Sequence, residues 1–247
     1  MDAARFRFPG LPRTIETVLF DFGGTLDADG VAWMDRFRAL YEAEGLVTTA
    51  DAFAPAFFAA DDPLVGGLAS SAGLKETVRA LAANLEAQLD ARGSLPGAEQ
   101  ADGDRSRSVA ERFLSDASII FARNRPVLEA LAGRCRLGVV SNFYGNLEAV
   151  CASSGLAPFF GVMADSHRVG AKKPDPAIFR AALDALVAAP ETTLYVGDSL
   201  RRDCEGARRA GLSFVWITPE GAGTEAHAAA PVAASLSELP QLLDLLE

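Results

Sequence analysis

The stretch "VLFDFGGTLD", residues 18–27, is an apolar run that ends in an aspartate and then turns through two glycines. The residues before Asp21 are typical of a buried strand, and the Gly-Gly pair is typical of the turn that ends one. A carboxylate in this place can act as a nucleophile. Taken alone, an aspartate before two glycines is more often a turn residue. The remaining sequence is needed to distinguish between these two interpretations.

The sequence of the 247-residue chain predicts a helical region after the first strand, followed by a regular alternation of strands and helices. Between 31 and about 121 no run is convincingly strand-like, and apolar spacing predicts helices at 31–45, 49–62, 73–93 and 109–124, with a loop at 94–108. Later strands are expected at 136–142, 159–165, 192–199 and 213–218. Helices are expected between them and at 235–247.

This alternation predicts an α/β fold, a doubly wound parallel sheet with helices on both faces. The helical block is too long to be one crossover between neighbouring strands, so we expect it to form a separate layer over the sheet. The predicted division is a core domain of residues 1–27 and 122–247 and a helical cap domain of residues 28–121. Hinges are expected near 27–30 and 121–126.

Polar side chains follow several of the predicted strands. Asp21 ends the first strand, Ser141 and Asn142 end the second, and Asp198 ends the fourth, with Asp203 five residues later. The loop "GAKKPDP" adds two of the only three lysines in the chain, Lys172 and Lys173. Ligands of open parallel sheets bind beyond the carboxyl ends of the strands. Carboxylates, a hydroxyl and an ammonium group at one edge suit magnesium binding and phosphoryl transfer.

Each of these motifs alone has an ordinary explanation as a turn or a helix cap, but their conjunction in chain order does not. The chain resembles the haloacid dehalogenase-like (HAD) superfamily of hydrolases, with a Rossmann-like core and a cap inserted after the first motif. The stretches that carry the resemblance are "VLFDFGGTLD", "LGVVSN", "VGAKKPDPAIF" and "LYVGDSLRRDCEGARRAGL".

The resemblance implies a role for each matching residue. Asp21 would be the nucleophile that forms an aspartyl-phosphate, Ser141 would bind a phosphoryl oxygen, and Lys173 would neutralise charge. Mg²⁺ would be held by Asp21, the backbone carbonyl of Gly23, Asp198 and Asp203, where Asp203 acts through water or orients Lys173. Gly24, Thr25 and Asn142 are expected to contact substrate. Lys172 matches no family position and is expected to be solvated.

The sequence departs from the family pattern at Gly23. In phosphatases of the family this position is a second Asp, which protonates the leaving group and then activates water. Nucleophilic attack and metal binding survive its loss, but the general acid, whose contribution is about 10² to 10⁴ in rate, does not. Asp27 and Asp29 could supply a compensating carboxylate, although we expect Asp27 to cap the turn.

Four interpretations of this departure remain open. The chain is a phosphatase whose leaving group is already good, such as an acyl or enol phosphate, or whose substrate supplies the proton. Alternatively it is a 2-haloacid dehalogenase, although "GDSLRRD" keeps the metal-binding residues which that branch has lost. A phosphonatase would need a Schiff-base lysine in the cap, where Lys75 lies in a stretch that does not match that family. The fourth is a non-catalytic or weakly active binding or scaffold protein.

The net charge of −10 makes nucleic acid and anionic membranes poor partners, and no apolar run approaches the roughly 18 residues needed to span a bilayer. The N-terminal stretch has no signal-peptide pattern, so a cytoplasmic location is expected. The expected function is Mg²⁺-dependent hydrolysis of a small phosphorylated metabolite. Arg36 or Arg38 in the cap is a candidate contact for a substrate anion. The sequence does not indicate the oligomeric state.

Overall fold

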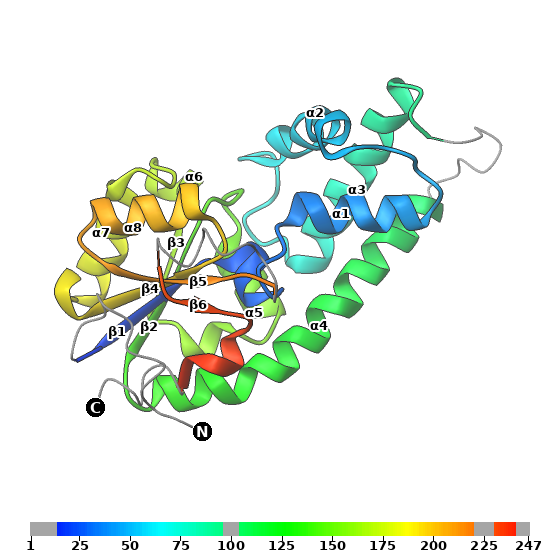
Figure 1. Cartoon of the computed structure of the whole chain (residues 1–247). Helices are drawn as coiled ribbons and strands as arrows, with labels where there is room; N and C mark the ends of the chain where they lie inside the picture. Colours follow the sequence, from blue (N-terminus) through cyan, green and yellow to red (C-terminus); the bar gives the residue numbers. More distant parts are fainter. Residues whose placement is uncertain (1–13, 96–103, 220–229, 241–247) are drawn as a thin grey trace.

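A computed structural model describes residues 14–95, 104–219 and 230–240, in which six parallel strands form one sheet with helices on both faces (Figure 1). The strand order is β3-β2-β1-β4-β5-β6. The strands are β1 (Thr17–Phe20), β2 (Arg136–Ser141), β3 (Val162–Asp165), β4 (Thr193–Gly197), β5 (Ser213–Ile217) and β6 (Val232–Ala233). The doubly wound α/β fold predicted from the sequence is thereby confirmed. The strand β6 is not predicted from the sequence, because it is only two residues long and carries no alternation.

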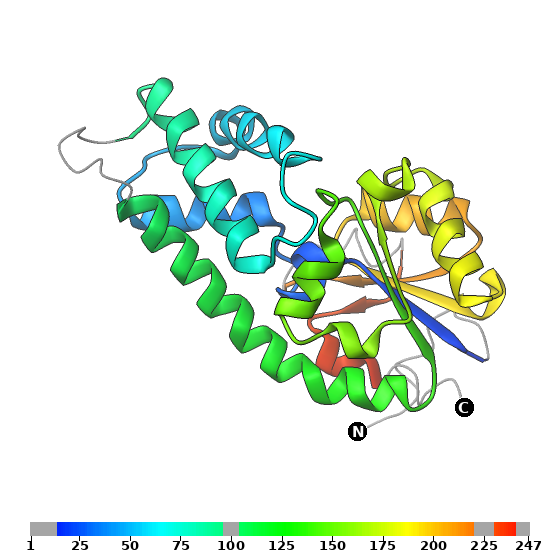
Figure 2. The same cartoon turned by 180° about the vertical axis from the view of Figure 1, so that it is seen from behind.

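Successive residues of the central strands face opposite sides of the sheet, so each face has its own set of apolar side chains. Val18 and Phe20 pack on the face covered by the second half of α4 (Asp104–Ala132) and by α5 (Leu147–Ser153). Leu19 packs on the opposite face. That face is covered by α7 (Pro176–Leu186) and α8 (Glu205–Arg209), next to the short α6 (Ser166–Val169). Figure 2 shows α5 and the lower half of α4 together on one side of the sheet.

The inserted helices α1 (Trp33–Ala43), α2 (Ala50–Asp61) and α3 (Leu74–Ala91) stand beyond the end of the sheet, beside the first half of α4 (Figure 1). The helix α2 continues through Pro55 instead of ending there, and Thr49 caps its first turn. The loop expected at 94–108 is shorter than predicted, because α4 already begins at Asp104, while residues 96–103 lie outside the described part.

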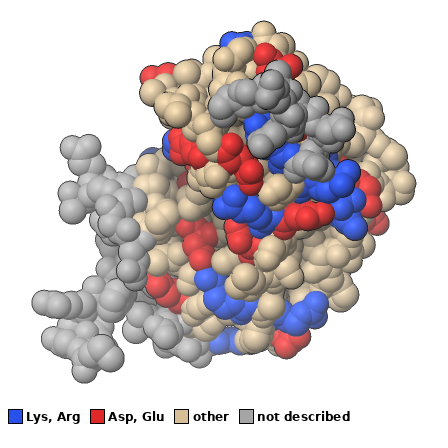
Figure 3. Space-filling view, turned by 90° about the vertical axis from the view of Figure 1, so that its right-hand side faces the viewer, with Lys and Arg blue, Asp and Glu red and all other residues tan. Residues whose placement is uncertain are grey.

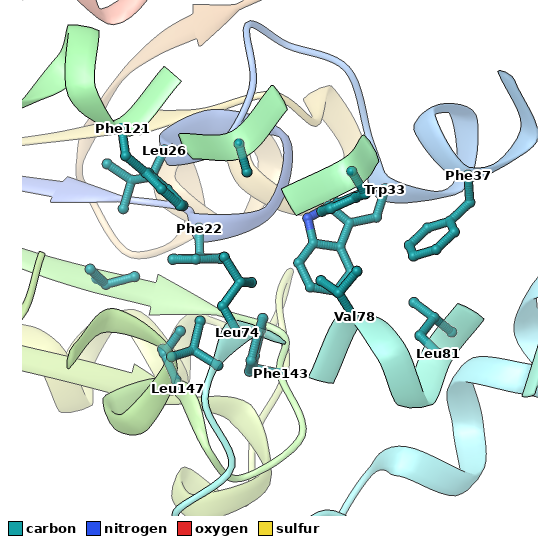
Figure 4. Packing of buried hydrophobic residues seen from close by; sticks show 14 of the residues in the cluster. Phe22, Leu26, Trp33, Phe37, Leu74, Val78, Leu81, Phe121, Phe143 and Leu147 are labelled. Atoms are coloured by element: carbon teal, nitrogen blue, oxygen red, sulfur yellow. The ribbon is translucent and has the colours of Figure 1, made fainter. Parts of the chain in front are cut away.

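The helix α4 connects the inserted helices to the sheet without interruption, passing through Pro126. The predicted boundary at 121/122 and the hinge expected at 121–126 therefore fall inside a continuous helix. Apolar packing is also continuous, since one cluster of buried residues extends from the sheet into the inserted helices. Figure 4 shows Trp33 between Phe37 of α1 on one side and Phe22 and Phe143 beside the sheet on the other. The division into core and cap domains stays a prediction.

The distribution of surface charge and the character of the helices are relevant to possible partners. Acidic and basic side chains are interspersed over the face shown in Figure 3. Among the described residues, none of the helices combines the length and the apolar character that a bilayer crossing requires. The helix predicted at 235–247 appears in the described residues only as the turn η9 (Leu236–Glu238), and residues 241–247 lie outside them.

Candidate active site

The candidate site lies where β1, β2 and β4 end side by side. Asp21 follows β1 directly, and its backbone N–H donates to the carbonyl of Val196 in β4 at 2.9 Å. Ser141 is the last residue of β2, and Asp198 follows β4. Parallel pairing in matched register brings these ends to one edge, as the sequence predicted.

The Asp21 carboxylate is almost buried and is held by three donors that all reach the same oxygen. Its Oδ1 accepts hydrogen bonds from the backbone N–H of Phe22 at 2.7 Å and from Ser141 Oγ at 2.7 Å, and Lys173 Nζ lies 2.8 Å away. These contacts fix the orientation of the carboxylate. None of the three donors contacts its other oxygen, Oδ2. Two residues assigned by resemblance, Ser141 and Lys173, therefore contact Asp21 directly.

Lys173 is fully buried between carboxylates. Its Nζ lies 2.7 Å from Asp203 Oδ1 as well as 2.8 Å from Asp21 Oδ1. Burial alone would lower the pKa of Lys173, but the charges of Asp203 and Asp21 outweigh it and raise that pKa. The lysine is therefore held as a cation. Lys172, its neighbour in sequence, is exposed, in agreement with the sequence prediction.

The Asn142 side chain holds the segment that carries Lys173. Its Oδ1 accepts from the backbone N–H of Lys173 at 2.7 Å, and its Nδ2 donates to the Lys173 carbonyl at 3.1 Å. Both ends of the amide are thus engaged by the chain itself. The structure gives this side chain a positioning task, whereas the sequence analysis expected a substrate contact.

Tyr195 belongs to the site although the sequence analysis did not select it. Its hydroxyl donates to the Val140 carbonyl at 2.9 Å and accepts from Lys173 Nζ at 3.0 Å. Asp203 Oδ2 in turn accepts from the backbone N–H of Ser199 at 2.9 Å. Tyr195 occupies an inward position of β4, and a strand pattern alone cannot distinguish such a tyrosine from an ordinary core residue.

Three carboxylates converge in a manner that fits a divalent cation. Asp21, Asp198 and Asp203 each offer an oxygen, and these oxygens all lie within 4.8 Å of one another. Asp198 Oδ1 is buried and has no hydrogen-bond partner among the described residues. Burial, with the charges of Asp21 and Asp203, raises the pKa of Asp198 well above its ordinary value. An unpartnered buried carboxylate oxygen is costly, and hard oxygen donors are the ligands that Mg²⁺ prefers.

Two glycines, one after β1 and one at the end of β4, leave room for this acidic cluster. A Cβ at Gly24 would lie 2.5 Å from Asp198 Oδ2, and Gly24 has a φ of +89°, which favours glycine. A Cβ at Gly197 would lie 2.6 Å from the Asp203 carboxylate. Thr25 Oγ1 is buried beside this turn without a hydrogen-bond partner in the described part of the chain. Both glycines are thus needed for the close approach of the carboxylates.

The two arginines that were candidate contacts for a substrate anion form ion pairs with other side chains. Arg36 forms a 2.7 Å ion pair with the buried Asp27, and Arg38 pairs with Glu42 at 2.8 Å on its own helix. Another arginine, Arg202 in the turn η7 (Leu200–Cys204), lies in the field of the acidic cluster. Burial would lower its pKa, but the charges of the three cluster carboxylates outweigh this and raise it. No spacing pattern distinguishes Arg202 from the other arginines of the sequence.

Fold and site together define an α/β protein with a buried acidic cluster at the carboxyl edge of a parallel sheet. The family model of the haloacid dehalogenase-like hydrolases matches residues 15–211. The chain therefore belongs to the haloacid dehalogenase-like hydrolase family, which confirms the resemblance seen in the sequence.

Individual relatives are similar over parts of their length. The chain is 34% identical over 164 residues to mouse haloacid dehalogenase-like hydrolase domain-containing protein 3, covering 64% of this chain and 62% of the relative. It is 36% identical over 131 residues to the phosphoserine phosphatase of Thermus thermophilus, covering 48% and 50%. The chain thus spans less than two thirds of the length of these curated relatives. The crystal structure of Bacillus subtilis YfnB shares the fold, with a TM-score of 0.59, 23% identity and coverage of 94% and 99%.

Proposed function

We propose that this chain is a Mg²⁺-dependent phosphatase that hydrolyses a small phosphorylated metabolite through an aspartyl-phosphate on Asp21. The observation that carries the proposal is the buried cluster of Asp21, Asp198 and Asp203 with Lys173 across it. Two relatives, the phosphoserine phosphatase of Thermus thermophilus and a glyceraldehyde 3-phosphate phosphatase of Pyrococcus furiosus, agree with this reaction class.

In the proposed reaction an oxygen of Asp21 forms a bond to phosphorus while the bond from phosphorus to the leaving-group oxygen breaks. Water then hydrolyses the aspartyl-phosphate, which releases phosphate and restores the carboxylate. Ser141 and Lys173 hold Asp21 before the reaction and are near enough to donate to phosphoryl oxygens during it. Gly24 and Thr25, in the turn after Asp21, are proposed to contact the phosphoryl group.

Asp21, Asp198, Asp203 and the carbonyl of Gly23 would hold the magnesium ion. When bound, the ion supplies positive charge that stabilises the charge on the transferring phosphoryl group. Lys173 adds a second, fixed positive charge beside Asp21. Because the charges of Asp203 and Asp21 keep it protonated, its task is to neutralise charge and not to accept a proton.

The proposal is tested by phosphate release from phosphate esters and acyl phosphates, with Mg²⁺ and with EDTA. We expect activity only with Mg²⁺, and a loss of at least about 10³-fold in Asp21→Asn, since the nucleophile is removed. Asp90→Asn, an exposed position on α3, is the matched control and should keep full activity.

Each contrary outcome points to a different function. Phosphate release that persists in Asp21→Asn, or in EDTA, would overturn the proposed mechanism. Halide release from 2-haloacids without Mg²⁺ would indicate a dehalogenase instead. Phosphate binding without turnover of any compound would indicate a binding or scaffold protein.

A further inference from the structure

The glycine at position 23 is not required by the backbone. Gly23 has φ −76° and ψ 120°, which any residue can adopt, whereas the adjacent Gly24 has a positive φ of 89°. Turn geometry therefore explains why residue 24 is glycine but does not explain residue 23. The reason must lie in what surrounds the missing side chain.

The space beside Gly23 is filled by Trp33 at the start of α1. A Cβ at Gly23 would lie 3.1 Å from Trp33 Nε1 and 3.3 Å from its Cδ1, closer than side chains normally pack. The indole packs against rings on three elements, with centroid separations of 5.2 Å to Phe113, 5.9 Å to Phe143 and 6.4 Å to Phe37. Figure 4 shows Phe37 and Phe143 beside it. A Cβ at position 23 would therefore require the indole, which is packed against these rings, to shift by a few tenths of an ångström.

Neither Trp33 nor its partner offers a proton to the site. The indole N–H donates to Asp27 Oδ2 at 2.7 Å, and Arg36 donates to the same oxygen at 2.7 Å. The other oxygen of Asp27 accepts from the backbone N–H of Gly24 at 2.7 Å, and Asp27 is fully buried. Asp27 caps the turn, as the sequence predicted, and is not a substitute acid.

Other side chains that could donate a proton are also engaged in ion pairs or hydrogen bonds. Asp29 forms a two-pronged pair with Arg123 at 2.7 and 2.5 Å. Ser141 and Lys173 donate to carboxylates of the site. Apart from the metal-binding cluster itself, no carboxyl group in the described part of the chain contacts Asp21. Among the described residues, a leaving group would therefore find no carboxyl group outside the acidic cluster in contact with Asp21 that could protonate it.

We propose that the Gly23–Trp33 pair sets the substrate class: this site hydrolyses phosphates whose leaving group departs as a stable anion, above all acyl phosphates. The inference rests on the proposed phosphatase function. As the bond from Asp21 to phosphorus forms, the bond to the acyl oxygen breaks and its electron pair leaves with a carboxylate. Water then attacks phosphorus, the bond to Asp21 breaks, and the protons of the water go to phosphate and solvent. Trp33 is the specificity-determining residue, because its indole lies within 3.1 Å of the place where a side chain at position 23 would begin.

The test compares kcat/KM with Mg²⁺ for acetyl phosphate, 4-nitrophenyl phosphate, phenyl phosphate and glycerol phosphate, whose leaving groups become progressively more basic. Without a general acid, kcat/KM should fall steeply along this series. The fall should be at least about 10²-fold larger than for an enzyme that protonates its leaving group. Glycerol phosphate hydrolysed as fast as acetyl phosphate would overturn the inference but leave the phosphatase proposal standing. Silence on all four compounds would overturn both.

Variants separate the steric part of the inference from the chemical part. Gly23→Asp alone should gain little on phenyl or glycerol phosphate, because its side chain meets the indole. Gly23→Asp with Trp33→Leu should gain about 10 to 10²-fold on these two compounds and little on acetyl phosphate. Trp33→Leu alone adds no proton donor and should gain on neither. Thermal unfolding confirms that each variant is folded, and equal gains in Gly23→Asp and in the double variant would contradict the steric role of Trp33.

Discussion

At the scale of single residues, Asp27 connects the turn after β1 to α1. It accepts from Gly24, Trp33 and Arg36 and is completely buried. Removing one partner of a buried ion pair leaves the other groups unsatisfied, which typically costs about 3–5 kcal/mol. We therefore expect Asp27→Ala to lower the free energy of unfolding by an amount in this range, measured by urea denaturation.

Asp29, two residues away, is the matched control. Its pair with Arg123 is partly exposed, at 29% and 38%, so solvent screens the interaction. Asp29→Ala should cost no more than about 1 kcal/mol. Equal losses in the two variants would mean that the Asp27 network contributes no more than a surface ion pair.

The sequence predicted much of the site because its residues sit at strand ends, where position alone implies convergence. Asp21, Ser141 and Asp198 could be placed at one edge in this manner, while Lys173 and Asp203 lie in segments further beyond the strands. The Gly23–Trp33 contact could not, because it joins a loop to a helix ten residues on and depends on the side-chain conformation of the indole. Tyr195 was equally hidden, since its hydroxyl contacts are visible only after folding.

At the scale of elements, Tyr144 and Asp61 connect the loop after β2 to the end of α2. The Tyr144 hydroxyl donates to Asp61 Oδ1 at 2.5 Å, and the Tyr144 carbonyl accepts from Gly66 at 3.0 Å. Burial raises the pKa of Asp61, and the bond from Tyr144 opposes this rise only in part. The contact therefore joins the loop after β2 to α2 through a carboxyl group that is easier to bury protonated than charged.

This raised pKa gives a pH dependence with a definite sign. Stability from such a group is present below the carboxyl pKa of the unfolded chain and is lost as pH rises through the folded-state pKa. Asp61→Asn should thus become more stabilising, relative to wild type, as pH rises from about 4 to about 7. Thermal unfolding over this range, with Asp90→Asn as an exposed control, measures it. A difference that stays constant or shrinks with rising pH would contradict the expectation.

Elements with strong periodicity were predicted best. The helix α3 (Leu74–Ala91) buries one apolar stripe and could be located from its spacing alone. By contrast, α4 runs without interruption through Pro126, where the sequence suggested a hinge. The same helix packs against α3 and also contacts β2. Tertiary contacts outweighed the local signal there.

At the scale of the whole molecule, metal binding should appear as stability. A ligand that binds only the folded state adds about 2.7 kcal/mol at a hundredfold excess over its Kd, which corresponds to a rise in Tm of about 5–10 °C for a chain of this size. Saturating Mg²⁺ should raise the Tm of the wild type in this manner, and EDTA should reverse it. Asp198→Asn should lose most of the shift. An equal shift in that variant would place the ion outside the acidic cluster.

If Asp21 carries the phosphoryl group during turnover, as proposed, the aspartyl-phosphate can be trapped. A single turnover with acetyl phosphate and Mg²⁺ is quenched in acid, and the peptides are analysed by mass spectrometry. We expect a phosphoryl group on the peptide containing Asp21 in the wild type and none in Asp21→Asn. Phosphate release at full rate with no phosphoryl group on that peptide, and undiminished in Asp21→Asn, would contradict the proposal.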